Sequence, residues 1–293
     1  MNATEFCKFL EALGHRVIGT PSAHWYDVNR FFFQGAPPHL EYQPDQKELR
    51  SLLRQGRCFG VRFATPISCQ GMASYQIVCD NRSYGLEALS GNVRSKVRRG
   101  LKRCTVGAVD FSVLATAGRK AHGDTLARQG RDGVLDGERW DRFWAAAAAT
   151  PGFEAWGAWN GDTLAAFLVS VAFGDSVEFM LARSCTDELG AYPNNALIYT
   201  VTEEMLIRRG LREVTFGLEA LEPVTALDEF KFGMGFSKRP LRQRVFFHPV
   251  LGAMLRVSSV RALVRRYSVR RGQDAGFWRK AAGLLRFAEE GGW

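Results

Sequence analysis

The feature that most constrains the fold of this chain is an order of strand, loop, helix and strand between residues 177 and 217. Apolar residues at 177–183 predict one strand, and residues 213–217 predict another. Residues 196–209 between them predict a helix, which the polar loop 187–195 precedes. Two strands joined by a helix are expected to pair in parallel, because parallel pairing needs a long crossover. The free N–H groups that open this helix would suit an anionic or carbonyl group.

The rest of the chain predicts a mixture of helices and strands. A hairpin is expected from residues 154–172, because the turn Asn160-Gly161 separates two apolar runs. After the second parallel strand, residues 227–236 predict a short helix, and a last strand is expected around residues 244–248. Further strands are predicted at 30–33, 58–64, 74–79 and 109–114, and helices at 45–53, 93–104, 124–131 and 136–150.

Composition excludes several classes of protein. The chain has 293 residues with 46% hydrophobic and 24% charged residues, which is typical of a soluble globular protein. No apolar run reaches the roughly 20 residues of a membrane span, and the N-terminus does not resemble a signal peptide. The six cysteines are scattered without a Cys-x-x-Cys pair, and the histidines lack the spacing of metal ligands. We therefore expect a cytoplasmic protein without a metal, a redox cofactor or a disulfide framework.

The net charge of +9 is concentrated in two segments. Residues 252–293 hold nine Arg or Lys against three Asp or Glu, and their apolar residues recur at near-helical spacing. We expect a basic amphipathic helix there, interrupted near Gly272 and resumed to Phe287. It would pack on the body of the protein, with contact to RNA or to a membrane surface as the alternative. The other basic segment is the predicted helix 93–104, whose charges suit a solvated face or a phosphate-rich substrate.

The strand, loop, helix and strand order resembles the second half of a GNAT acyltransferase domain. The segment from Asp228 to Phe236, which reads Asp-x-Phe-Lys-x-x-x-Gly-Phe, more narrowly resembles the Fem-type branch of that superfamily. Members of this branch move aminoacyl groups from tRNA onto peptidoglycan precursors. The resemblance implies an α/β (α+β) fold with two tandem GNAT-like domains, whose mixed sheets are splayed at the centre. We place the domains at residues 1–115 and 116–250, with a basic helical tail at 251–293.

The resemblance implies transfer of an aminoacyl or acyl group to an amine of a peptide, sugar or cell-envelope precursor. Coenzyme A-dependent GNAT enzymes usually carry a glycine-rich loop before the central helix. This chain has only Gly190 there, and Pro193 lacks a backbone N–H that a pyrophosphate would use. We therefore favour aminoacyl-tRNA over acyl-coenzyme A as the donor. An acyl-coenzyme A-dependent N-acetyltransferase remains an alternative, and so does a non-catalytic GNAT-like module that binds nucleic acid or a membrane surface.

Three residues are candidates for catalysis. In Fem-type enzymes a lysine in a matching segment lies near the reacting groups, which implies that Lys231 stabilises charge on the oxyanion or on the leaving group. Asp228, three residues earlier, is close enough on a helix to pair with it, and a plain surface ion pair is the alternative. Glu219 follows a strand end, where α/β sheets present ligand groups, and is a candidate general base or a surface glutamate.

Five further residues are candidates for substrate binding. Tyr192, Asn194 and Asn195 lie where the loop enters the central helix, although Asn194 would also serve as an ordinary helix cap. Arg98 and Arg99 belong to the basic helix and would bind tRNA or a diphosphate-linked acceptor.

Overall fold

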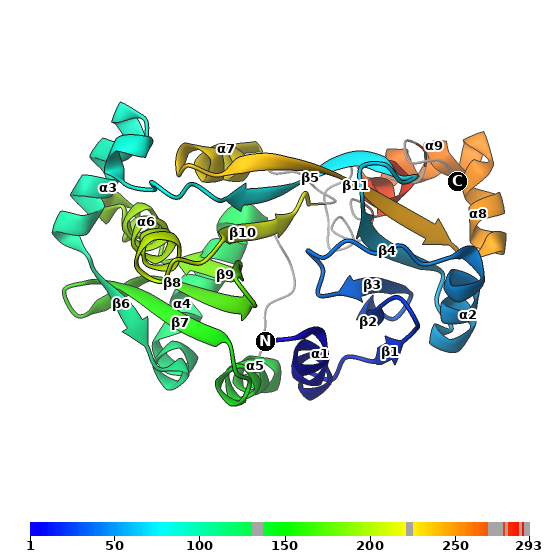
Figure 1. Cartoon of the computed structure of the whole chain (residues 1–293), viewed down its shortest axis with the longest axis horizontal. Coiled ribbons are helices and arrows are strands. Elements are labelled where there is room, and N and C mark those ends of the chain that lie inside the picture. Colours follow the sequence, from blue (N-terminus) through cyan, green and yellow to red (C-terminus); the bar gives the residue numbers. More distant parts are fainter. Residues whose placement is uncertain (131–136, 221–224, 269–277, 279–280, 287–288, 290–293) are drawn as a thin grey trace. The chain divides into compact units, whose positions relative to one another are not determined.

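We describe the chain from a computed structural model, in which the described residues are 1–130, 137–220, 225–268, 278, 281–286 and 289. The chain forms two compact units, each built from segments that are distant in the sequence (Figure 1). Unit 1 comprises Met1–Glu5, Ile77–Gly217 and Thr225–Lys238. Unit 2 comprises Phe6–Gln76, Leu218–Val224 and Arg239–Trp293. Strands β5 (Met72–Cys79) and β11 (Ser237–Phe247) pass from one unit into the other.

Unit 1 is a mixed sheet covered by helices. Its strand order is β5-β10-β9-β8-β7-β6; the pairs β6·β7, β7·β8 and β8·β9 are antiparallel, and β9 and β10 are parallel. The strands are β6 (Thr105–Val109), β7 (Phe153–Asn160), β8 (Thr163–Phe173), β9 (Ser176–Ser184) and β10 (Glu213–Leu218). The helices are α3 (Gly91–Arg103), α4 (Phe111–Gln129), α5 (Gly137–Ala149), α6 (Pro193–Glu203) and α7 (Thr225–Gly233). Short turns of helix lie at Leu86–Ala88, Leu189–Ala191 and Glu204–Arg208, the last of them a π-turn.

Strand β8 shows why this sheet is helix-covered. Its residues 164–171 are all buried, although successive side chains of a strand point to opposite faces. Both faces must therefore be covered, and α4 and α6 both pack on β8. The ring of Phe167 in β8 lies 5.8 Å from that of Trp144 in α5. Burial of such large apolar side chains is the main favourable term in the stability of the unit.

Unit 2 repeats the same strand, helix and parallel-strand arrangement. Its strand order is β1-β2-β3-β4-β11-β5, and β3 pairs in parallel with β4 across the crossover helix α2. The remaining strands are β1 (Val17–Gly19), β2 (His24–Asn29), β3 (Phe32–Ala36) and β4 (Gly60–Thr65). The helices are α1 (Ala3–Ala12), α2 (Gln46–Gly56), α8 (Pro249–Arg256) and α9 (Ser258–Ser268). The core of this unit contains the fully buried side chains of Trp25, Phe33, Leu49 and Leu52.

Several predicted elements are confirmed. Strands β9 and β10 are parallel neighbours joined by α6, which begins at Pro193. The hairpin of β7 and β8 forms across Asn160-Gly161, and Gly161 takes the positive φ of 55° that such a turn needs. Asp45 caps α2, where its carboxylate accepts a hydrogen bond from the N–H of Glu48. The basic helix predicted at 93–104 is α3.

The strand predicted at 109–114 is wrong. Strand β6 ends at Val109, and α4 starts at Phe111. The alternation of apolar residues favoured a strand, but the buried side chains of α4 recur at helical intervals at Leu114, Ala121 and Thr125. The predicted domain boundary near Ala115 therefore falls inside a helix. Each compact unit also combines segments from before and after residue 115, so neither unit coincides with the range 1–115 or 116–250.

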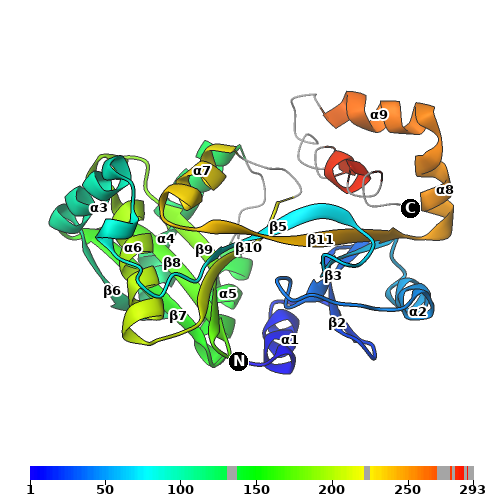
Figure 2. The same ribbon diagram turned by 45° about the horizontal axis from the view of Figure 1, so that its top comes forward.

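The basic tail begins as two helices and not as one. Helix α8 ends at Arg256, Val257 after it is extended with a ψ of 124°, and α9 begins at Ser258 (Figure 2). The interruption predicted near Gly272 lies outside the described residues, and so does Phe287. No helix in the described ranges is both long enough and apolar enough to cross a membrane.

Candidate functional site

The two parallel strands of unit 1 separate after a short paired stretch. Glu213, Val214 and Thr215 of β10 pair with residues 176–178 of β9, and the register ends there. Both strands continue, to Leu218 and to Ser184, and Figure 1 shows them diverging. Beyond Glu178, β9 therefore forms no ladder of backbone hydrogen bonds with β10. The sheet of unit 1 is splayed at its centre, as the sequence predicts.

A bulge in β9 coincides with this divergence. Val169 of β8 pairs with Leu181, but Ser170 pairs with Phe179, so Met180 is an extra residue in β9. A bulge leaves one residue out of the ladder and turns its backbone groups away from the regular pattern. Met180 lies two residues beyond the last pair with β10. At the bulge and the divergence the main chain of β9 has no register with β10, and N–H groups left unpaired in this way could donate to the oxygen of a bound carbonyl.

Aromatic rings surround the start of the divergence. Phe216 is the first residue of β10 beyond the paired stretch, and its ring centre lies 5.3 Å from that of Phe179 and 4.7 Å from that of Phe236. Phe179 and Phe236 are buried. These rings make an apolar wall that lowers the local dielectric and strengthens charge interactions beside it.

Lys231 reaches this wall from α7. Its ammonium group lies 5.5 Å from the ring centre of Phe216 and 2.8 Å from Oδ1 of Asp228. The Lys231 and Asp228 side chains are only 14% and 16% exposed, so the pair is more desolvated than an ordinary surface ion pair. The predicted helical pairing of these two residues is confirmed, and the structure places their charges at the diverging strands.

Glu178 is a site residue that the sequence analysis missed. It occupies the last position of β9 that pairs with β10. A Cβ atom added to Gly217 would lie 3.2 Å from Oε1 of Glu178, so this carboxylate lies against the backbone of β10. Gly217 also has a positive φ of 77°, which favours glycine. The available signal was one acidic residue inside an apolar strand.

The loop before α6 is held by internal contacts. Tyr192 takes a left-handed conformation with φ of 59°, and Pro193 follows at the first helical position. The Asn194 amide donates to Oγ of Ser184 at 3.0 Å, whereas the Asn195 amide lies 3.5 Å from the sulfur of Met234, just after α7. Asn194 therefore ties the loop to the end of β9, and it is not the capping residue.

Helix α3 packs against the N-terminal end of α6, as Figures 1 and 2 both show. A Cβ atom added to Gly100 would lie 2.6 Å from the Tyr192 carbonyl oxygen and 3.1 Å from Cβ of Ala196. Glycine therefore allows an approach that any larger residue would prevent. Arg103 donates to the carbonyl of Gly190 at 2.7 Å, and the Ala196 N–H is used by the Tyr192 carbonyl. The first turn of α6 is consequently covered by protein.

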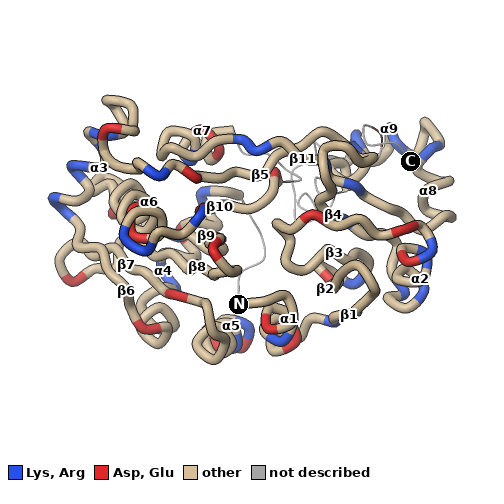
Figure 3. Tube along the Cα trace, viewed as in Figure 1, with Lys and Arg blue, Asp and Glu red and all other residues tan. Residues whose placement is uncertain are grey.

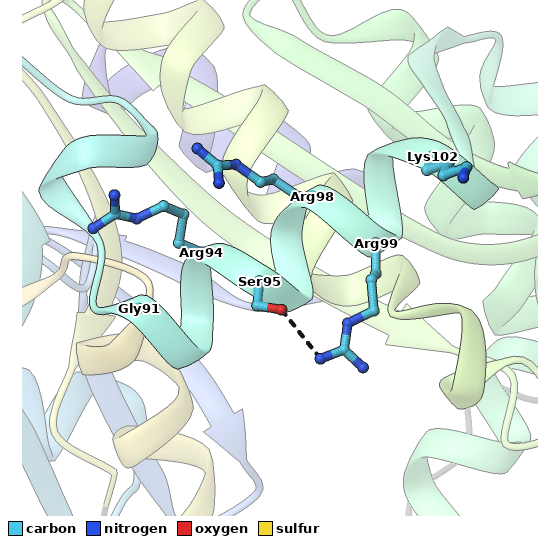
Figure 4. Close-up of a pocket in the computed structure, with 6 residues that line it drawn as sticks. All are labelled: Gly91, Arg94, Ser95, Arg98, Arg99 and Lys102. Carbon is cyan, nitrogen blue, oxygen red and sulfur yellow. Dashed lines mark hydrogen bonds between the residues drawn. The ribbon is translucent and has the colours of Figure 1, made fainter.

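The outer face of α3 forms an open basic depression of about 530 Å³ (Figure 4). It is lined by Gly91, Arg94, Ser95, Arg98, Arg99 and Lys102. Arg99 donates to Oγ of Ser95 at 3.1 Å and lies over the ring of Tyr192. Arg98 is 3.6 Å from Glu87, an exposed acid outside the helix. Helix α3 itself contains six Arg or Lys residues and no acid, so a phosphate group would meet an excess of positive charge.

Glu219, the third predicted catalytic residue, belongs to unit 2, whereas Lys231 and Asp228 belong to unit 1. Its carboxylate accepts a hydrogen bond from Ser74 at 2.7 Å and lies 3.5 Å from Nη2 of Arg286. Its carbonyl oxygen accepts from Arg62 and from Gln243. Burial lowers the pKa of Arg62 to about 10. This buried polar network gives Glu219 a structural role, and its role as a general base stays a prediction.

His122 lies on α4, where it is buried against Arg183 of β9. Its Nδ1 accepts a hydrogen bond from Nε of Arg183 at 3.2 Å, so Nε2 carries the hydrogen of the neutral ring. Burial, together with the positive charge of Arg183, lowers the pKa of His122 to about 4. In the unfolded chain His122 takes up a second ring proton near pH 6.5, whereas in the folded protein it does so only near pH 4. The contribution of His122 to stability is therefore complete above about pH 6.5 and is lost as the pH falls towards 4.

We expect His122→Gln to reduce this pH dependence. Between pH 6.5 and 4, the wild-type protein should lose roughly 1–3 kcal/mol more free energy of unfolding than the variant does. Chemical denaturation at a series of pH values measures the difference. If the free energy of unfolding depends on pH equally in both proteins, the pKa of His122 is not lowered by folding.

Comparison with known proteins identifies the fold. No protein-family model matches the sequence, and no curated protein matches it. The crystal structure of FemX is similar with a TM-score of 0.59 and 12% identity, over 86% of this chain and 93% of that one. The C-terminal domain of a putative lysylphosphatidylglycerol synthetase from Agrobacterium fabrum has a TM-score of 0.58 and 11% identity, over 90% and 91% of the two chains. L-PGS from Bacillus licheniformis has a TM-score of 0.55 and 11% identity, over 92% and 98%.

These similarities extend over most of every chain compared, but the identities are low. They therefore establish the fold and leave the substrates open. The chain has the Fem-like α/β fold of these structures, with mixed sheets.

Proposed function

We propose that this protein is an acyltransferase that moves an aminoacyl group from charged tRNA to an amine. The acceptor would be an amine of a peptide, a sugar or a cell-envelope precursor. The observation that carries the proposal is the divergence of β9 and β10, with a bulge at Met180 and the Lys231 ammonium beside Phe216. The proposal places the reaction in the cytoplasm, where charged tRNA is available.

The chemistry assigns a role to each group at the divergence. The neutral amine attacks the ester carbonyl, a C–N bond forms, and the carbonyl oxygen becomes an oxyanion. Main-chain donors near Met180 and the Lys231 ammonium would stabilise this charge. When the C–O bond breaks, the ribose hydroxyl of tRNA leaves and needs the proton that the amine gives up. Glu178 is the carboxylate at the divergence that we assign to this proton transfer.

Two observations support tRNA as the donor over acyl-coenzyme A. Pro193 lacks an N–H that could hold a pyrophosphate at the start of α6, and α3 packs closely against that start at Gly100. The basic face of α3 offers charges to a polyphosphate chain instead. One similar protein is a putative lysylphosphatidylglycerol synthetase, and a lysyl group attached to phosphatidylglycerol is an aminoacyl product.

We expect coenzyme A to bind weakly, with a Kd above about 1 mM, because Pro193 removes one backbone donor and α3 packs against the start of α6. Isothermal titration of the purified protein with coenzyme A measures this. Micromolar binding that disappears in a Tyr192→Ala variant would instead make acyl-coenzyme A the better donor.

The function itself is tested by supplying donors and acceptors together. The protein is incubated with tRNA charged with labelled amino acids and with a panel of amine acceptors, and products are identified by mass spectrometry. An amide product that forms only with charged tRNA supports the proposal. Transfer from acyl-coenzyme A alone, or no transfer with any donor, would contradict it.

A further inference from the structure

Helix α8 in unit 2 carries apolar side chains on two faces, and only one face is packed. Leu251 and Leu255 lie against the buried cluster of β11 and β5. Val250 and Met254 of α8, with Val257 directly after the helix, follow at intervals of four and three residues, so they form a second stripe. These three side chains are 64%, 53% and 49% exposed.

Two exposed aromatic rings lie at the start of the same helix. Phe31 and Phe59 stack with ring centres 5.2 Å apart, and they are 41% and 48% exposed. The N–H of His248, which precedes α8, donates to the carbonyl of Phe59 at 2.7 Å. Five of the twelve large apolar side chains exposed among the described residues thus belong to this part of unit 2. Apolar side chains gathered in this way mark an interaction surface.

Positive charge borders the apolar side chains. Lys47, Arg50 and Arg54 lie on one face of α2 and line an open depression of about 580 Å³ together with His248 and Pro249 at the start of α8. Figure 3 shows basic residues along α2 and along the segment of α8 and α9. The one acid of α2 outside its cap, Glu48, is engaged with Ser22 at 2.6 Å.

We propose that this surface of unit 2 binds the face of an anionic phospholipid bilayer. The α8 stripe with Phe31 and Phe59 would enter the boundary between headgroups and acyl chains. Lys47, Arg50 and Arg54 would contact lipid phosphates in the α2 depression. This combination of an apolar stripe and adjacent cations is the pattern of helices that lie in the membrane interface.

The apolar stripe favours a bilayer over the other occupants. Nucleic acid is held chiefly through its phosphates and gains little from valine and methionine side chains. A second copy of the chain would bring the basic depressions of two molecules near each other in a symmetric interface, where like charges repel. An anionic bilayer satisfies the charges and the apolar side chains together.

Flotation with lipid vesicles tests the inference with the full chain. We expect binding to vesicles of phosphatidylcholine and phosphatidylserine in equal parts, and little binding to phosphatidylcholine alone. The inference is independent of the proposed reaction, so Lys231→Ala should bind the vesicles as the wild-type protein does.

Two sets of variants separate the contributions of the apolar stripe and of the basic depression to vesicle binding. The variant Val250→Ser, Met254→Gln, Val257→Ser should weaken binding at least about tenfold. The variant Lys47→Gln, Arg50→Gln, Arg54→Gln should weaken it by about tenfold to a hundredfold, since each basic residue near the surface contributes about 1 kcal/mol. Matched controls remove exposed apolar or basic residues elsewhere: Ile67→Ser with Ile207→Ser, and Arg119→Gln with Arg142→Gln. Circular dichroism confirms that each variant is folded.

Several results would overturn the inference. Wild-type protein that stays out of anionic vesicles would do so, as would variants and controls that bind equally. A dimer that the apolar variant abolishes, without any vesicle binding, would assign the surface to a second copy. Binding of RNA that only the basic variant weakens would assign the depression to nucleic acid.

Discussion

Replacing Lys231 with alanine is expected to lower turnover by about a hundredfold or more. Its ammonium group lies beside Phe216, where β9 and β10 part, and both side chains of its ion pair with Asp228 are largely buried. A positive charge held in this position stabilises an oxyanion or a leaving alkoxide without any reorganisation, and removal of one such donor typically costs 2.7 kcal/mol or more. Steady-state turnover of the wild-type protein and of Lys231→Ala measures the effect.

The matched control is Lys238→Ala, which removes an exposed lysine after α7 and should leave turnover unchanged. An ion pair with a purely structural role would contribute roughly 0–1 kcal/mol to stability and nothing to the rate. Thermal unfolding of Lys231→Ala therefore accompanies the kinetic measurement. Wild-type turnover in a folded Lys231→Ala protein would remove Lys231 from the site.

The second large effect is expected on tRNA affinity. The double variant Arg98→Gln, Arg99→Gln removes two of the charges that line the α3 depression. If both arginines contact phosphates, affinity at low salt should fall about tenfold or more, and the slope of log affinity against log salt should decrease by roughly two. Filter binding at several salt concentrations measures both quantities.

The control for charge alone is Arg119→Gln with Arg142→Gln, which removes two exposed arginines from α4 and α5. This pair should change the salt slope much less. Equal losses in both double variants would mean that tRNA responds to net charge and that α3 is not its binding surface.

The sequence predicted the central part of the fold because local signals and topology agree there. Residues 177–217 contain two apolar runs joined by a helix, which is the crossover that a parallel pair needs. The same segment predicts the splay only through its resemblance to GNAT domains. Met180 is not recognisable as a bulge, because a bulge depends on how β8 and β9 pair.

The prediction failed where one pattern fitted two structures. Val109, Phe111, Val113 and Leu114 alternate like a strand, but the helix α4 buries Leu114 and later residues at helical spacing. The domain limits at residues 115 and 250 stay a prediction, and the compact units join segments that are distant in the chain. Contacts of that kind leave no local signal in the sequence.

The candidate site was predictable in part. Lys231 was identified only through the resemblance of its segment to Fem-type enzymes, and its spacing of three residues from Asp228 predicted their ion pair. Asn194 was predicted as a ligand-binding residue or a cap, yet its amide bonds to Ser184 at the end of β9. Glu178 was missed because its position beside Gly217 depends on the register between β9 and β10.

A competition between two labelled donors tests the central claim most directly. One reaction contains tRNA charged with an isotopically heavy amino acid, the corresponding light aminoacyl-coenzyme A, and an acceptor amine identified in the screen. Mass spectrometry of the amide product then reports which donor supplied the group. Our account predicts a heavy product that Lys231→Ala forms about a hundredfold more slowly. A light product, or a heavy product formed equally fast by that variant, would contradict it.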